Sequence, residues 1–233
     1  MWPEVKKCFD EKRYELVIVG PEIAKRVEDN QNNLDENIYK LKHLNFLEVS
    51  KTKLAILPPS LGFMENLSNL LCHSNELTSV PDEIGKLPHL KNLNLSNNKL
   101  TEIPQSLKNC KELFTINLSG NQLTKLFPLE NLAKLAVLDI NRNEFAELPE
   151  DLGSEKLENL SQINASYNKL VKLSDTLIEL PSLKLLNLEN NLITEIPCNL
   201  SQGAKLKDLL MKTNKLKDNR LKKLIEQDKV IID

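Results

Sequence analysis

Leucines recur along this chain in one arrangement, LxxLxLxxNxLxxLPxxLxxL, in which x stands for any residue. Eight copies follow one another at steps of 22 to 25 residues. Their first leucines are Leu44, Leu67, Leu90, Leu113, Leu135, Leu160, Leu183 and Leu206. An unbroken repeat of this length predicts a stack of equivalent units, each too small to bury its own apolar side.

The LxL segment of each copy alternates leucine with a variable residue, as in Leu93 and Leu95 around Asn94. This period of two predicts a short strand whose leucines point to one side and whose variable residues point to the other. Stacking such strands into a parallel sheet joins the leucines into one continuous core. We therefore predict an α/β solenoid, a curved horseshoe with the parallel sheet on its concave face and short turns or 3-10 segments on its convex face.

One polar position interrupts the leucine pattern where each predicted strand ends. Its residues are Asn75, Asn98, Asn121, Asn143, Asn168, Asn191 and Asn214, with Thr52 in the first copy. Backbone donors and acceptors lose their sheet partners at this point, and a short amide side chain can satisfy both kinds of group. We predict that these asparagines form a structural ladder.

The unbroken repeat leaves no place for a linker, so we expect a single domain over residues 1–233. Residues 1–43 should form an N-terminal helical cap and an irregular first unit. Residues 44–216 should form eight repeats, and residues 217–233 a C-terminal cap helix and tail. The ends must differ from the middle because an exposed terminal layer would leave its leucines in water.

Apolar residues at helical spacing predict the two caps. Residues 3–13 are expected to form an amphipathic helix over the first layer, followed by a strand at residues 14–19 and a second helix at residues 21–28. The apolar face of the first helix consists of Trp2, Val5, Cys8 and Phe9. At the other end, one face of a short helix closes the last repeat, formed by Leu221, Leu224 and Ile225. Residues 230–232 leave an apolar tail, from which we expect the natural chain to continue.

The variable strand positions line the concave face, and function is expected there. Small uncharged side chains occupy the middle of this face, whereas larger or charged ones collect toward both ends. Exposed apolar and aromatic groups beside charges are the usual anchors of protein partners. The candidate partner-binding residues are Phe46, Glu48, Leu71 and His73 near one end, Leu185, Glu189, Leu210 and Lys212 near the other, and Asp139, Arg142 and Tyr167 between them. The alternative is that the polar middle only maintains solubility and cross-strand hydrogen bonds.

Patterns for catalysis and metal binding are scarce. One cluster has the elements of hydrolytic chemistry, namely Ser50, His73 and Ser96 at neighbouring positions of one column, with Glu48 nearby. An open, flat sheet supplies no obvious oxyanion hole, so we expect ordinary surface there and no enzyme activity. The sequence has no glycine-rich phosphate loop and no Cys-x-x-Cys or His-x-x-x-His pair, and Glu48 and Asp139 are too isolated for a calcium cage. We expect no catalytic residue, metal or cofactor.

The charge of the chain is unevenly distributed. A net charge of −2 argues against general adhesion to nucleic acid or anionic membrane. Residues 205–229 differ, because nine basic residues against four acidic ones give this segment a charge of +5. Lysines on a short exposed helix usually form a solvated face. The alternative for this segment is a contact with RNA or an acidic protein.

Targeting signals are not recognisable in the sequence. The first fifteen residues carry charges throughout, unlike a signal peptide, and no apolar run approaches the roughly 20 residues needed to cross a bilayer. The four cysteines are scattered along the chain, whereas disulfide-closed ends would need clustered ones. We expect a cytoplasmic monomer in a reducing compartment, with no membrane contact.

The repeats resemble the leucine-rich repeat family. Five of them carry a proline behind an apolar residue, at Leu57-Pro58, Val80-Pro81, Ile103-Pro104, Leu148-Pro149 and Ile196-Pro197. In this feature they look like the intracellular class, which includes Ras-pathway scaffolds. The resemblance implies a leucine-rich repeat solenoid that serves as a non-catalytic protein-protein interaction module or scaffold.

The two ends are similar to a narrower group, the family of leucine-rich repeat-containing protein 47. The similar segments are Trp2-Pro3-Glu4, Glu15-Leu16, Gly20-Pro21, Arg26-Val27 and the run NKLKDNRL that begins at Asn214. Members of that family carry a C-terminal part resembling the B3/B4 domain of the phenylalanyl-tRNA synthetase beta subunit, a part that this sequence does not contain. The resemblance implies the N-terminal part of a longer protein and, as the alternative function, an RNA- or translation-associated adaptor.

Overall fold

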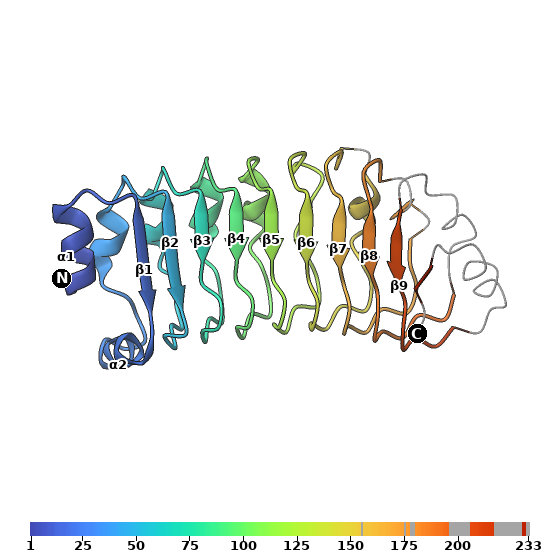
Figure 1. Ribbon diagram of the computed structural model, residues 1–233, viewed down its shortest axis with the longest axis horizontal. Helices are drawn as coiled ribbons and strands as arrows, with labels where there is room; N and C mark the ends of the chain where they lie inside the picture. The colour runs from blue at the N-terminus through green and yellow to red at the C-terminus, as the bar shows by residue number, and fades with distance from the viewer. Residues whose placement is uncertain (155, 175, 178–179, 196–205, 217–229, 232–233) are drawn as a thin grey trace.

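The computed structural model describes residues 1–154, 156–174, 176–177, 180–195, 206–216 and 230–231. In these residues ten strands form one open parallel sheet, and each strand pairs with the next along the chain. Figure 1 shows the strands side by side in a long row, with short helical segments behind them. The predicted solenoid with its parallel sheet is confirmed.

Each of the eight predicted repeats contributes one short strand, and one further strand lies at each end of the row. The strands are β1 Glu15–Val19, β2 Phe46–Ser50, β3 Asn69–Leu71, β4 Asn92–Asn94, β5 Thr115–Asn117, β6 Val137–Asp139, β7 Gln162–Asn164, β8 Leu185–Asn187, β9 Asp208–Leu210 and β10 Val230–Ile231. Their register sets equal repeat positions opposite one another, as in Leu70 beside Leu93. The strand expected at residues 14–19 is β1, which adds a layer to the sheet ahead of the repeats.

The leucines of the repeats form the core behind the sheet. Both leucines of an LxL segment, such as Leu93 and Leu95, are buried, and one apolar cluster continues from Val5 to Met211. Each such side chain contributes about 1.5–3 kcal/mol by leaving water. Because every layer buries a similar set, stabilisation is distributed along the row rather than concentrated at one point.

Short 3-10 helices cover the opposite side of the core. They are η1 Glu36–Lys40, η2 Pro59–Phe63, η3 Asp82–Lys86, η4 Gln105–Asn109 and η5 Glu150–Gly153. Neighbouring helices approach closely: a Cβ atom added to Gly85 in η3 would lie 2.4 Å from the carbonyl oxygen of Ser106 in η4. Glycine therefore permits the backbone contact at this position.

Two α-helices, α1 Pro3–Asp10 and α2 Pro21–Asp29, lie at the N-terminal end of the row (Figure 1). The expected helix at residues 3–13 is thus shorter at its C-terminal end. Val5 and Cys8 are buried, but Phe9 is 57% exposed, so its assignment to the apolar face was wrong. A helix turns by about 100° per residue, which carries Phe9 away from the surface that Cys8 covers.

Asp35 ties α1 to the first 3-10 helix. Its Oδ1 accepts hydrogen bonds from the backbone N–H of Asn37 at 2.9 Å and from Asn37 Nδ2 at 2.7 Å. Its Oδ2 accepts from the backbone N–H of Trp2, and the N-terminal ammonium lies 3.7 Å away. One buried carboxylate therefore fixes both the start of η1 and the residue that precedes α1.

The C-terminal end differs from its expected form. Val230 and Ile231, expected in a tail, form β10 and pair with Leu209 and Leu210 of β9. Two apolar residues that can alternate beside an open sheet edge fit such a strand. The cap helix expected at Leu221, Leu224 and Ile225 lies outside the described residues.

The asparagines after the strands link successive repeats. In the representative Asn98, Nδ2 donates to the carbonyl oxygens of Cys72 and Leu95, both at 2.9 Å, and Oδ1 accepts from the N–H of Leu77 at 3.0 Å. Each side-chain amide thus supplies hydrogen-bond partners to backbone groups on two adjacent turns, where the bonds of the sheet end. In the first repeat, the N–H and the hydroxyl of Thr52 both donate to Asn75 Oδ1 at 2.9 Å.

Candidate functional site

The candidate site is the solvent-facing side of the sheet, here called the sheet face. In the three-residue strands β3 to β9 the central residue is buried and the flanking residues are at least partly exposed. Because the strands are in register, outward residues of equal repeat position form columns across the sheet. The candidate residues lie either on strands, as Phe46, Glu48, Leu71, Asp139, Leu185 and Leu210 do, or just beyond them, as His73, Arg142, Tyr167, Glu189 and Lys212 do.

Four apolar side chains on the first three strands form what we call the N-terminal patch, and they are Val17, Val19, Phe46 and Leu71. Val17 is 52% and Val19 41% exposed, whereas Phe46 and Leu71 are half-buried. The register places Val17 beside Glu48, and Glu48 beside Leu71. The sequence indicated Phe46 and Leu71 but not the two valines, because it did not show that β1 joins the same sheet.

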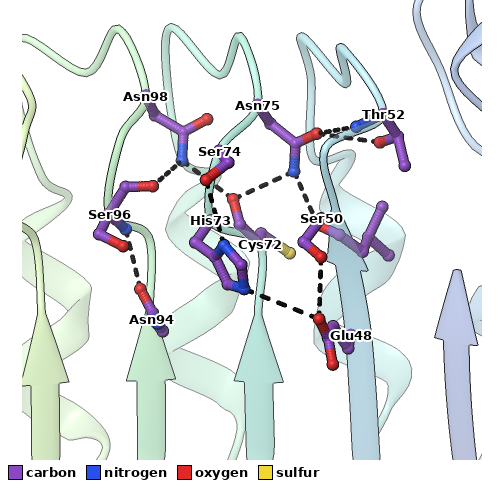
Figure 2. A network of polar contacts seen from close by, with 11 residues as sticks. Glu48, Ser50, Thr52, Cys72, His73, Ser74, Asn75, Asn94, Ser96 and Asn98 are labelled. Carbon is purple, nitrogen blue, oxygen red and sulfur yellow. Dashed lines mark hydrogen bonds and ion pairs between the residues drawn. The ribbon is translucent and has the colours of Figure 1, made fainter. Parts of the chain in front are cut away.

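Glu48 connects two polar neighbours within this patch (Figure 2). Its Oε1 accepts a hydrogen bond from Ser50 Oγ at 2.8 Å and lies 3.7 Å from His73 Nε2, while His73 Nδ1 lies 3.2 Å from Ser74 Oγ. Ser50 and Ser96 are both buried. In a hydrolytic triad the imidazole bonds the serine that attacks. Here the hydroxyl of Ser50 bonds the carboxylate instead, so the contacts do not follow that order.

Short polar side chains fill the middle of the sheet face and bond within their own turns. Asp139 Oδ1 accepts from the N–H and from Nδ2 of Asn141, at 3.1 and 2.6 Å. Equivalent bonds to the N–H two residues later are made by Asn94, Asn117, Asn164 and Asn187. Between strands, Asn92 Nδ2 donates to Asn69 Oδ1 at 2.6 Å. This internal bonding favours a structural role for the polar middle.

Arg142 and Tyr167 form a stacked pair beyond the ends of β6 and β7. The guanidinium carbon of Arg142 lies 4.6 Å from the centroid of the Tyr167 ring, within the range of a cation–π contact. The side chain of Tyr167 is 48% exposed, and Arg142 is exposed as well. The pair therefore presents a fixed positive charge to solvent at the border of the sheet face.

The candidates near the C-terminal end lie on neighbouring strands. Leu185 of β8 pairs with Asp208, and Leu210 of β9 pairs with Asn187, so the two leucines are diagonal neighbours. Both are half-buried, as are Glu189 and Lys212 beyond the strands. Strands β4 to β7 separate this group from the N-terminal patch. The structure thus brings the candidates together in separate groups rather than in one site.

Phe114 is an exposed aromatic residue that the sequence analysis missed. It immediately precedes β5, on the border of the sheet face opposite the turns that carry Arg142 and Tyr167. Most equal positions in other repeats hold polar residues, such as Lys91, Ser161 and Lys184, and the apolar Ala136 is small and buried. This departure from a polar column was the signal that could have identified Phe114.

The described cysteines are buried thiols without disulfides. Burial raises the pKa of Cys72 to about 12 and that of Cys110 to about 11, and it also raises the pKa of Cys8. Such thiols are poor nucleophiles at neutral pH. Within the described residues no group of three or more His, Cys, Asp or Glu side chains could hold a metal ion. No helix in this part of the chain is long and apolar enough to cross a membrane.

Comparison with known proteins identifies the repeats. The family model described as leucine rich repeat matches residues 65–123 and 133–193. A probable inactive serine/threonine-protein kinase, roco10 of Dictyostelium discoideum, is 32% identical over 105 residues, which cover 43% of this chain and 4% of that protein. The chain therefore matches only a small part of that relative's length.

Two solved structures share the fold. One is a plant peptide hormone receptor, RGFR1, in complex with RGF2, with a TM-score of 0.60 and 23% identity over 79% of this chain and 34% of that one. The other is the functional domain of InlJ from Listeria monocytogenes, with a TM-score of 0.57 and 24% identity over 80% of this chain and 43% of that one. The family model covers just over half of the residues, and the repeats it matches form one parallel sheet, so this chain belongs to the leucine-rich repeat family.

Proposed function

We propose that this chain is a non-catalytic protein-interaction module whose sheet face binds a partner protein, with the N-terminal patch as its main anchor. The observation that carries the proposal is the gathering of Val17, Val19, Phe46 and Leu71 on three adjacent strands, next to a middle of the sheet face that is mostly polar. Apolar groups clustered in this way mark partner-binding surfaces more often than isolated ones do.

The polar surroundings of the patch also suit a binding surface. Glu48 lies between Val17 and Leu71 in the register, and its contacts with Ser50 and His73 hold the carboxylate in place. A partner that covers the valines would shield these contacts from water, and a polar rim of this kind contributes specificity. The structure of RGFR1, a plant receptor with the same fold, was determined in complex with RGF2.

Replacing Phe46 and Leu71 together by Asp tests the proposal. Both side chains face outward and are only half-buried, so the fold should tolerate the change. A partner would have to bury two unpaired charges, at a cost of about 3 kcal/mol or more, which corresponds to a loss of more than 100-fold in affinity. Affinity purification from cell extract, with quantification of every bound protein, measures the effect.

Phe63→Asp is the matched control. Phe63 is the last residue of η2, behind the sheet, and is 62% exposed. The substitution Phe63→Asp therefore removes an exposed apolar group from the side opposite the sheet face. Partners should be lost from the Phe46→Asp/Leu71→Asp protein and retained by the control. Retention of every partner by both proteins would contradict the proposal.

The alternative is an RNA- or translation-associated adaptor. It is supported by the basic charge of residues 205–229, most of which lie outside the described residues, and by the resemblance of the ends to the leucine-rich repeat-containing protein 47 family. It predicts retention on immobilised RNA that weakens steeply with salt and disappears when Lys222 and Lys223 are replaced by Glu. No contact among the described residues adds to this alternative.

We further propose the cellular setting of this module. Three buried free thiols and no described disulfide are compatible with a reducing, cytoplasmic location. The continuous sheet is compatible with one domain over residues 1–233 and with a monomer. The remaining candidates, Leu185, Glu189, Leu210 and Lys212, would then form a secondary contact on the same face.

A further inference from the structure

The turns after the strands share a backbone conformation that few side chains favour. In each repeat, the residue just before the ladder position has a positive φ, between 53° and 66°. These residues are Lys51, Ser74, Asn97, Gly120, Arg142, Tyr167, Asn190 and Thr213. Glycine and asparagine adopt this left-handed region readily, whereas a bulky tyrosine seldom does.

The repeat itself imposes this conformation, because from Lys51 to Asn190 the N–H of each such residue bonds the next turn. Arg142 N–H donates to the carbonyl oxygen of Ser166 at 3.0 Å, and Tyr167 N–H donates to that of Glu189 at 2.8 Å. A strained bulky residue persists where the surroundings determine the backbone, and such residues concentrate at functional sites. Turn formation therefore does not explain why a tyrosine occupies this left-handed position.

Stacking on Tyr167 orients the guanidinium of Arg142. The two residues occupy equal positions of adjacent repeats, and their separation of 4.6 Å places the charge over the ring. Within the described residues Arg142 has no carboxylate partner, in contrast to Arg13 and Arg26, which pair with Glu11 and Glu4. Its planar set of N–H donors is held in place and left open to solvent.

The charged residues around Arg142 indicate which kind of anion can bind there. A guanidinium bonds a carboxylate through two parallel N–H···O contacts. A phosphate group carries nearly two negative charges and is usually bound by several cations. Here Asp139 lies three residues before Arg142, and Glu189 belongs to the turn that bonds Tyr167. One cation between two acidic residues suits a singly charged carboxylate.

We propose that the Arg142–Tyr167 pair binds the carboxylate of an Asp or Glu side chain in an extended segment of the partner protein. This inference rests on the proposed function, because the same segment would reach the N-terminal patch. Leu71 lies on β3 and the pair follows β6 and β7, so three to four strand spacings of about 4.8 Å separate them. An extended chain covers that distance in about four to six residues. The segment should therefore carry an apolar residue and an acidic one at this separation.

A display library of random linear peptides, selected on the intact protein, tests the proposal. Selected peptides should share an acidic residue about four to six positions from an apolar one. Changing that acid to its amide should weaken binding about tenfold or more to the unmodified protein, yet hardly at all to Arg142→Asn. Tyr167→Asn should weaken binding of the acidic peptide about threefold, since the arginine keeps its charge but loses the stack.

Thr213→Asn is the control, because it makes the same kind of substitution in the same column away from the pair and should leave binding unchanged. Asparagine suits the left-handed turn, so Tyr167→Asn should melt no lower than the unmodified protein. A loss of binding would then reflect the stack rather than the fold.

Several results would overturn the inference. They are selection of no peptide, an effect of the acid that persists in Arg142→Asn, and tighter binding when phosphoserine replaces the acid. Peptides that bind Arg142→Asn as tightly as the unmodified protein, but do not bind Phe46→Asp/Leu71→Asp, would overturn the inference. They would leave the proposed function intact. Intact partners that bind regardless of Phe46 and Leu71 would count against the proposed function instead.

Discussion

A ladder asparagine bonds buried backbone groups of its own repeat and of the preceding one. Asn121 Oδ1 accepts from the N–H of Leu100 at 3.0 Å, and its Nδ2 donates to the carbonyl oxygens of Leu95 and Leu118, both at 3.0 Å. The side chain is buried, so water cannot replace these bonds. The carbonyl of Leu95 also accepts from Asn98 and that of Leu118 from Asn143, so the N–H of Leu100 is the group that would lose its partner without Asn121.

Asn121→Ala should therefore lower the free energy of unfolding by about 1–3 kcal/mol, because the N–H of Leu100 would stay buried and unpaired. Urea unfolding followed by circular dichroism measures the change. Asn109→Ala, at an exposed position of η4, should alter the free energy by no more than about 0.5 kcal/mol. Equal losses in both variants would contradict the structural role of the ladder.

At the residue scale, the repeat predicts which side chains face outward but not how far each is exposed. Period-two alternation is enough to place Phe46 and Leu71 on the sheet face. Their half-burial depends on the neighbouring strands, which the linear sequence does not specify. The same limit applies to Val17 and Val19, whose place in the patch depends on the pairing of β1 with β2.

At the scale of secondary-structure elements, the attachment of α1 to η1 depends on the charge of Asp35. Burial alone would raise the pKa of Asp35, but hydrogen bonds from the backbone N–H groups of Asn37 and Trp2, the Asn37 amide and the nearby N-terminal ammonium hold it below its ordinary value. A carboxyl whose pKa is lowered by folding stabilises the folded state at pH values above its unfolded pKa. That stabilisation is lost as the pH falls through the folded value.

Acidification should consequently loosen the attachment of α1 to η1. The loss should begin as the pH falls below about 4, the ordinary range of an aspartate. Fluorescence of Trp2, the single tryptophan of the chain, reports on this contact. Asp35→Asn should remove most of the acid-dependent change, whereas Glu36→Gln, at an exposed neighbouring position, should not. An unchanged acid response in Asp35→Asn would contradict the assignment.

The secondary-structure elements also show which features the sequence pattern predicts and which it does not. The strand β1 and both N-terminal helices were predictable, because apolar spacing and Pro3 and Pro21 mark them. The end of α1 and the exposure of Phe9 were not, since they depend on how much of β1 the helix covers. Likewise, β10 forms because β9 offers an open edge, which a short apolar run does not reveal.

On the scale of the whole molecule, a uniform core supports an uneven surface. The repeats in the described residues bury equivalent, mostly leucine positions, so the fold follows almost entirely from the repeat. The sheet face is different in each repeat: apolar side chains gather at β1 to β3 and again at Leu185 and Leu210, most of the middle is polar, and the Arg142–Tyr167 pair is charged. Partner choice can therefore vary with the outward residues while the inward ones maintain the same architecture.

The central claim is that the partner covers the sheet face, and residue-level hydroxyl-radical footprinting of the protein with and without a purified partner tests it most directly. We predict that partner binding lowers the oxidation of Phe46, Leu71 and Tyr167 and leaves that of Phe9 and Phe63 unchanged. Protection of Phe63, on the side opposite the sheet, with unaltered oxidation of Phe46 and Leu71 would contradict the account.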